Sequence, residues 1–202
     1  MRYGMVIDLK RCVGCYGCQT ACKAEHGTPP GVFRTRVLKQ ERGEYPTVSL
    51  LSLPVQCNHC SDPPCVDVCP TGASFVHKED GIVDIDADKC VGCRSCMMAC
   101  PYSNRYHVAE RLNYYGDKGP TVFEAYWNGR SQEGIVTKCD FCRSRVKSGL
   151  EPACVANCPT VARYFGDLDD PTSKVSRLIK ERGGFALHPE KGTRPNVFYL
   201  PA

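Results

Sequence analysis

The sequence predicts an α+β fold made of two similar modules organised around cysteine. Sixteen of the 202 residues are cysteines, and they fall into four runs of four. Three of these runs end in Cys-Pro, at 69–70, 100–101 and 158–159. Segments 3–15 (YGMVIDLKRCVGC) and 81–93 (GIVDIDADKCVGC) repeat the order of a strand, a lysine-containing turn and C-V-G-C. A strand and cysteine run that occur twice indicate a duplicated unit.

The run from Cys90 to Pro101 has the clearest spacing, C-x2-C-x2-C-x3-C-P. Bacterial ferredoxins use this run, in which three thiolates bind one [4Fe-4S] cluster and the fourth ligates a second cluster. The run at 12–22 has the same spacing without the proline. Zinc sites usually combine two C-x2-C pairs about 15–20 residues apart, so zinc and a disulfide framework fit the pattern less well. The sequence therefore predicts a metal-binding protein that holds iron through cysteine.

The repeat also indicates how the runs combine. The segments that begin at Cys69 (CPTGASF) and at Cys158 (CPTVARYF) are similar. The strand after Cys69 is expected to pair with the strand before Cys90, and by the same logic the strand after Cys158 pairs with the strand before Cys12. One bacterial-ferredoxin-like 2[4Fe-4S] module is then inserted into a split outer module of the same kind.

This arrangement gives each of four [4Fe-4S] clusters four cysteine ligands and leaves no cysteine over. Each set is named after its first member. The predicted sets are the Cys12 set (Cys12, Cys15, Cys18, Cys158), the Cys22 set (Cys22, Cys139, Cys142, Cys154), the Cys57 set (Cys57, Cys60, Cys65, Cys100) and the Cys69 set (Cys69, Cys90, Cys93, Cys96).

The remaining segments predict additions to the two modules. Strands at 32–40 and 45–53 around ERGE predict a β-hairpin flap, either a support or a docking surface. The aromatic-rich insertion is expected to be loop with short strands, and either an interface or a small satellite core. A helix is expected over 171–182, with Asp170 as its N-cap. A final strand is expected in NVFYL. The predicted parts are the outer module (1–31 and 138–170), the flap (32–53), the inner module (54–106), the insertion (107–137) and a C-terminal helix and tail (171–202).

Other features of the sequence exclude several classes of function. The net charge is +4, but Lys and Arg are dispersed and cysteine thiolates would offset them, so nucleic acid is not a predicted partner. No apolar run approaches the roughly 20 residues of a membrane span, and the N-terminus has no export signal pattern. His59 lies between two cysteines and is expected to pack beside a cluster, whereas His26, His77, His107 and His188 are expected at the surface. No residue constellation indicates a catalytic site.

Four stretches carry a family resemblance. They are MVIDLKRCVGCYGCQTACK, QCNHCSDPPCVDVCPTGAS, KCVGCRSCMMACPY and KCDFCRSRVKSGLEPACVANCPT. They resemble the four-cluster iron–sulfur (beta) subunits of the dimethyl-sulfoxide-reductase family of molybdopterin oxidoreductases. PPGVF, GEYP, GDLDDP and GTRPNVFYL are most similar to the polysulfide, thiosulfate and respiratory arsenate reductase branch. Some relatives have tryptophan in place of a cysteine in the third run, and this chain does not.

The resemblance implies an electron-transfer subunit in anaerobic respiration. Its partners would be a molybdenum or tungsten catalytic subunit and a quinone-linked membrane subunit or another redox protein. The complex would be membrane-associated on the periplasmic side, through co-export with a signal-bearing partner, with the cytoplasm as the alternative compartment. The alternative function is a free-standing soluble polyferredoxin that carries electrons by diffusion.

Overall fold

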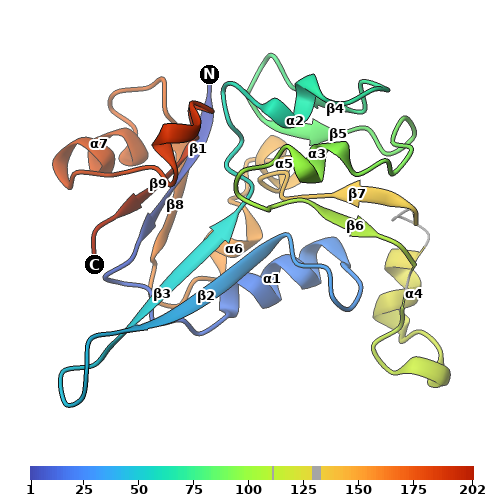
Figure 1. Cartoon of the computed structure of the whole chain (residues 1–202), viewed down its shortest axis with the longest axis horizontal. Helices are drawn as coiled ribbons and strands as arrows, with labels where there is room; N and C mark the ends of the chain where they lie inside the picture. Colours follow the sequence, from blue (N-terminus) through green and yellow to red (C-terminus); the bar gives the residue numbers. More distant parts are fainter. Residues whose placement is uncertain (111, 129–132) are drawn as a thin grey trace.

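Strand β1 (Tyr3–Asp8) lies at the centre of a sheet formed by the two ends of the chain (Figure 1). The structure is a computed structural model that describes residues 1–110, 112–128 and 133–202. Strand β1 pairs antiparallel with β8 (Arg163–Asp167) and parallel with β9 (Val197–Leu200). Alternate β1 side chains pack on opposite faces of the sheet, and Met5, Val6 and Ile7 are fully buried. The predicted pairing of the strand after Cys158 with the strand before Cys12 is confirmed.

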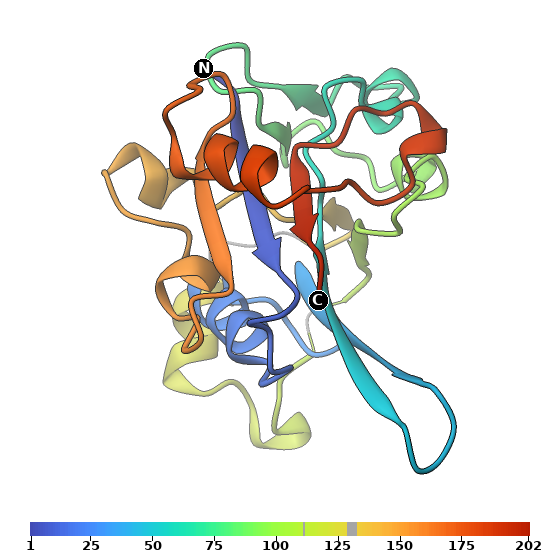
Figure 2. The ribbon, with the colours of Figure 1, turned by 90° about the vertical axis from the view of Figure 1, so that its left-hand side faces the viewer.

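Helix α7 (Lys174–Glu181) covers one face of this sheet (Figure 2). Val175 is buried against Val6 and Tyr164, and Leu178 and Ile179 pack at the edge of the same cluster. The predicted N-cap Asp170 was wrong. The N-cap is Ser173, three residues later, whose hydroxyl accepts a hydrogen bond from the Ser176 N–H. Asp170 instead accepts hydrogen bonds from Thr172 and closes the preceding turn.

Strands β2 (Thr35–Arg42) and β3 (Ser49–Gln56) form the predicted hairpin, which projects from the body of the protein in both views (Figures 1 and 2). Its base is fixed by burial of Val37 and Val55 and by the Tyr199 hydroxyl, which donates to the Pro54 carbonyl at 2.9 Å. The turn lies at 43–48 rather than at ERGE, because the antiparallel pairing continues to Arg42. Exposed side chains occupy the tip.

The predicted central hairpin consists of β4 (Ser74–Val76) and β5 (Val83–Ile85), and short helices α2 (Pro64–Asp67) and α3 (Ser95–Met98) contact each other beside it. Helix α1 (Gly17–His26) packs on α6 (Ala153–Ala156). Helix α1 ends at Gly27, which has the left-handed backbone (φ 54°) common at helix C-termini. Helix α5 (Arg143–Lys147) begins directly after a cysteine.

The insertion contains the expected short strands, β6 (Tyr106–Val108) paired with β7 (Ile135–Thr137). It also contains a 3-10 turn (Gly116–Lys118) and helix α4 (Val122–Asn128), which the glycine-rich sequence did not predict. The rings of Phe123 and Tyr126 contact Trp127, at centroid distances of 6.5 and 5.3 Å. The part of the insertion at 111 and 129–132 lies outside the described residues.

A second 3-10 turn (Pro189–Lys191) precedes β9.

Candidate metal centres

Three cavities are each lined by four cysteines from two different runs. The sulfur-bearing residues in their walls are the members of the Cys12, Cys57 and Cys69 sets, respectively. Each cavity therefore combines three cysteines from one run with one cysteine from another run. The shared lining of four cysteines indicates the same kind of bound group in all three.

The cysteines of the Cys22 set also lie close together, in a more buried place. All of them are buried, and Cys139 and Cys154 come from different elements than Cys22. Burial raises the pKa of Cys22 to about 12, and the charge of the neighbouring Cys154 adds to the rise. The pKa of Cys139 lies well above its usual value, because of burial first and then the charges of Cys22, Cys154 and Cys142. Such mutual repulsion requires the sulfur atoms to be near neighbours.

These sites fit an iron–sulfur cluster chemically. Burial, together with the charges of Cys57, Cys65 and Cys100, raises the pKa of Cys60 to about 12. Four thiolates in one buried place are stable only beside a cation, because their charges repel each other and are poorly solvated. Backbone N–H groups also point at sulfur: Ser74 donates to Cys69 Sγ and Ala162 to Cys158 Sγ, both at 3.3 Å. Such donors tune a bound cluster.

The first C-x2-C loop of each of the four runs shares one backbone feature. The residue before the second cysteine has a left-handed backbone in each loop, with φ of 66° at Gly14, 65° at Gly92, 44° at His59 and 53° at Phe141. This turn is costly for a residue with a Cβ, so glycine suits two of the loops. A Cβ on Gly92 would overlap the Gly134 carbonyl oxygen, so close packing excludes a larger residue there.

His59 and Phe141 occupy this position in the other two loops and stack on each other, with ring centroids 3.8 Å apart. His59 is fully buried, and its Nδ1 accepts the Val83 N–H at 3.2 Å. Burial holds the pKa of His59 well below its usual value, so the ring is neutral. His59 therefore packs between two cysteine loops, as expected.

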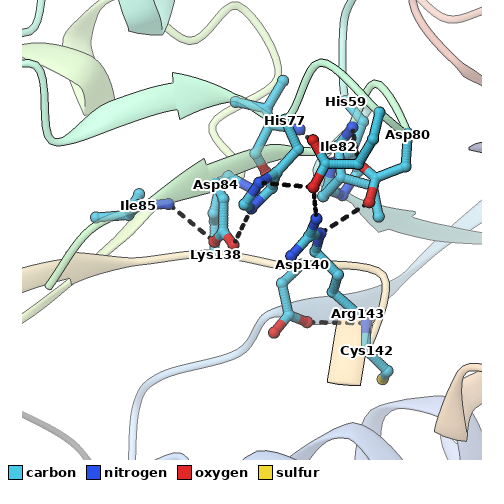
Figure 3. A network of polar contacts seen from close by, with 12 residues as sticks. His59, His77, Asp80, Ile82, Asp84, Ile85, Lys138, Asp140, Cys142 and Arg143 are labelled. Carbon is cyan, nitrogen blue, oxygen red and sulfur yellow. Dashed lines mark hydrogen bonds and ion pairs between the residues drawn. The ribbon is translucent and has the colours of Figure 1, made fainter. Parts of the chain in front are cut away.

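A network of polar contacts fixes the 138–143 loop to the β4–β5 hairpin (Figure 3). Arg143 Nε donates to Asp80 at 2.8 Å, and Lys138 donates to the carbonyls of Val83 and Cys139. Asp140 accepts the Cys142 N–H at 2.9 Å, which shapes the cysteine loop itself. The hairpin between the second and third cysteine runs thus positions the ligands of the fourth run.

The surface position predicted for His26 was wrong. Its side chain is 12% exposed, and its Nε2 lies 3.2 Å from Cys142 Sγ and 3.5 Å from Asp140. Arg34 Nη1 donates to its Nδ1 at 3.0 Å, which leaves Nε2 as the protonated nitrogen that can donate to sulfur. His77 is also largely covered, because it pairs with Asp84 at 3.1 Å. The His26 contact joins residues 116 positions apart, whereas His77 and Asp84 lie seven positions apart at the β4–β5 hairpin.

Sequence reasoning also missed two buried arginines that contact cysteine sulfur. Arg105 Nη2 lies 2.8 Å from Cys65 Sγ, and Arg163 Nη1 lies 3.7 Å from Cys154 Sγ. A signal was present, since each arginine follows the last cysteine of a Cys-Pro run by five residues.

Comparison with known proteins identifies the kind of site. The chain matches a 4Fe-4S dicluster domain family over residues 48–114 and 125–168, and a second 4Fe-4S dicluster domain model over 11–74. It is 41% identical to the arsenate respiratory reductase iron-sulfur subunit of a Shewanella species, covering 99% of this chain and 96% of that protein. It is 43% identical to the B subunit of the selenate reductase of Mesobacillus selenatarsenatis, covering 97% and 70% of the two chains. With the B subunit of the tetrathionate reductase of Salmonella typhimurium it shares 41% identity over 98% of this chain and 72% of that protein.

The chain belongs to the iron–sulfur subunits of the dimethyl-sulfoxide-reductase family. As a member of this family, it is an iron–sulfur electron-transfer subunit of a respiratory oxidoreductase. The relatives are named as subunits of larger enzymes, so a free-standing polyferredoxin is not favoured. Within the described part of the chain, no helix has the length and apolar character needed to span a bilayer.

Proposed function

We propose that the chain binds four [4Fe-4S] clusters, with the Cys12, Cys22, Cys57 and Cys69 sets as their ligands. The observation that carries this proposal is that three cavities are each lined by four cysteines of one predicted set. The mutual effect of Cys22, Cys139, Cys142 and Cys154 on their pKa values supports the fourth set. When bound, each cluster accepts and releases electrons at a potential set by its surroundings.

We further propose that the clusters are organised as an inner module within a split outer module. The pairing of β1 with β8 supports this organisation, because it joins the first cysteine run to the last. The β4–β5 pairing does the same for the second and third runs. The 138–143 loop packs against the β4–β5 hairpin, which supports transfer between the modules.

Electrons are proposed to enter and leave through the Cys12 and Cys69 sets. Cys15 and Cys93 are exposed, whereas every cysteine of the Cys22 set is buried. Since electrons reach a partner most directly from a cluster near the surface, the two exposed sets suit the two ends of a conducting chain. Cys154 is influenced by the charge of Cys18, which supports the Cys12 and Cys22 sets as neighbours.

The proposed partners are a molybdopterin catalytic subunit at one end and a quinone-linked membrane subunit, or another redox protein, at the other. The names of the relatives support this, because each belongs to a reductase of several subunits. The proposed location is a membrane-associated complex on the periplasmic side, reached by co-export with a signal-bearing partner.

The ligand sets are tested by iron analysis and by electron paramagnetic resonance (EPR) of the reduced protein. The unmodified chain should contain about 16 iron atoms and about 16 sulfides. Cys100→Ala should perturb the cluster of Cys57, Cys60 and Cys65 and leave that of Cys90, Cys93 and Cys96 unchanged. Met98→Ala is the matched control, because Met98 is 88% exposed in the same run. Loss of the Cys90 cluster in Cys100→Ala would contradict the assignment.

A further inference from the structure

Two arginines each follow the last cysteine of a Cys-Pro run at the same distance. Arg105 follows Cys100 by five residues, and Arg163 follows Cys158 by five residues. Both side chains are buried, with exposed fractions of 3% and 2%. A buried guanidinium is always charged and is costly unless a negative group lies close by.

Neither arginine has a carboxylate as that negative group. Among the ion pairs of the described residues, none includes Arg105 or Arg163. Arg105 donates to the neutral Ser74 hydroxyl at 2.8 Å, and Arg163 donates to Gln56 at 3.1 Å and to Thr35 at 3.2 Å. The cysteine sulfurs are therefore the negative groups that these side chains contact within the described part of the chain.

Arg105 lies between two cysteine sets. It is in the wall of the cavity of the Cys57 set and also in the wall of the cavity of the Cys69 set. Its Nη2 contacts Cys65 Sγ at 2.8 Å, whereas its Nη1 is buried without a hydrogen-bond partner among the described residues. Although burial opposes it, the charges of Cys65 and Cys96 raise the pKa of Arg105, and these two cysteines belong to different sets.

Arg163 has the corresponding position in the other pair of sets. It lines the cavity of the Cys12 set, and its Nη1 lies 3.7 Å from Cys154 Sγ of the Cys22 set. Against the effect of burial, the charges of Cys154 and Cys18 raise the pKa of Arg163, and these cysteines again belong to different sets.

We propose that Arg105 and Arg163 each place one positive charge beside two neighbouring clusters. Each charge raises the reduction potentials of both clusters of its pair. Reduction adds one negative charge to a cluster, and a fixed positive charge nearby stabilises the reduced state more than the oxidised state. Because each guanidinium is shared, it shifts both potentials of a pair in the same direction and does not by itself widen the difference between them. This inference rests on the proposed four-cluster function.

The test measures reduction potentials by EPR-monitored titration of the purified full chain, with iron content determined on the same samples. Arg105→Gln should lower the equilibrium constant for reduction at least about tenfold, or about 59 mV for one electron, in two of the four clusters. Arg163→Gln should shift the other two clusters by a similar factor. Arg42→Gln is the matched control, because this exposed arginine at the end of β2 lines none of the three cysteine cavities, so each equilibrium constant for reduction should stay within about threefold of the unmodified chain.

The two arginines must affect different pairs of clusters. Equal shifts of all four clusters in one variant, or no shift in a variant with full iron content, would overturn the proposal. If Arg105→Gln binds less iron, Arg105→Lys, which keeps the charge, should restore full iron content and near-native potentials. A lysine variant that lacks iron or has the lowered potentials would show that charge is not the cause. Fewer than four reducible clusters in the unmodified chain would instead refute the proposed function.

Discussion

Replacing His26 with alanine should lower the reduction potential of one cluster, the cluster proposed for the Cys22 set. His26 Nε2 lies 3.2 Å from Cys142 Sγ, and Arg34 holds the ring so that Nε2 carries the proton. The ring is neutral at neutral pH, because burial lowers the pKa of His26 to about 4, with Arg34 adding to this effect and Asp140 opposing it. The alanine variant loses this N–H donor to sulfur and keeps the net charge.

The size of the effect follows from the strength of the lost hydrogen bond. A hydrogen bond to a charged acceptor contributes about 1.5–3 kcal/mol, and we take about a third of this as the difference between the two redox states. The resulting 0.5–1 kcal/mol, roughly, corresponds to a decrease of about 20–40 mV for one electron. The decrease arises because the reduced cluster, being more negative, gains more from the donor.

An EPR-monitored redox titration measures this shift. His26→Gln retains an N–H donor and should shift the potential less, and His188→Ala, at an exposed histidine paired with Glu190, should leave it unchanged. Between about pH 6 and pH 8 the shift should be constant, since the pKa of about 4 keeps the ring neutral. An unchanged potential in His26→Ala with full iron content would refute the reasoning. Because the folded protein favours the neutral ring, this contribution to stability is complete above about pH 6.5 and decreases as the pH falls toward 4.

Two further predictions concern the packing around Gly92 and around Trp127. Gly92→Ala should remove about a quarter of the iron, as found by metal analysis, since its Cβ would overlap the Gly134 carbonyl. Gly72→Ala has the same φ of 65° with open space around its Cβ, so its iron content should be unchanged; equal losses in both variants would assign the effect to backbone strain instead. Trp127→Ala should increase hydrogen exchange in α4 without loss of iron, because Trp127 packs against Gly27 and lines none of the three cysteine cavities. Iron loss in this variant would contradict that separation.

Local spacing is the part of this protein that the sequence could predict. The cysteine runs are short, so covalent geometry limits which sulfurs can meet, and the repeated strands indicated the β1–β8 pairing that is present. The central hairpin and the end of α1 at Gly27 follow from turn chemistry, which is also local.

Local sequence patterns could not predict the contacts between distant segments. His26 meets Cys142 across 116 positions, and Arg163 meets Gln56 across 107 positions. Neither histidine nor arginine carries a periodic signal that would place it beside sulfur. Helix α4 was missed because its seven residues stand between glycine-rich stretches and carry too little periodicity. Likewise, the N-cap of α7 depended on a competition between Asp170 and Ser173 that only the turn geometry decides.

The central place of β1 has a consequence for synthesis. Its partners β8 and β9 are the last strands of the chain, so the sheet cannot be completed until residue 200 has left the ribosome. By contrast, β4 and β5, together with all members of the Cys57 and Cys69 sets, are already present at residue 100. At about 5–20 residues per second, the remaining hundred residues take roughly 5–20 s. During that interval the first cysteine run is present without its sheet partners, so the β4–β5 hairpin can form before the sheet of β1, β8 and β9 is complete.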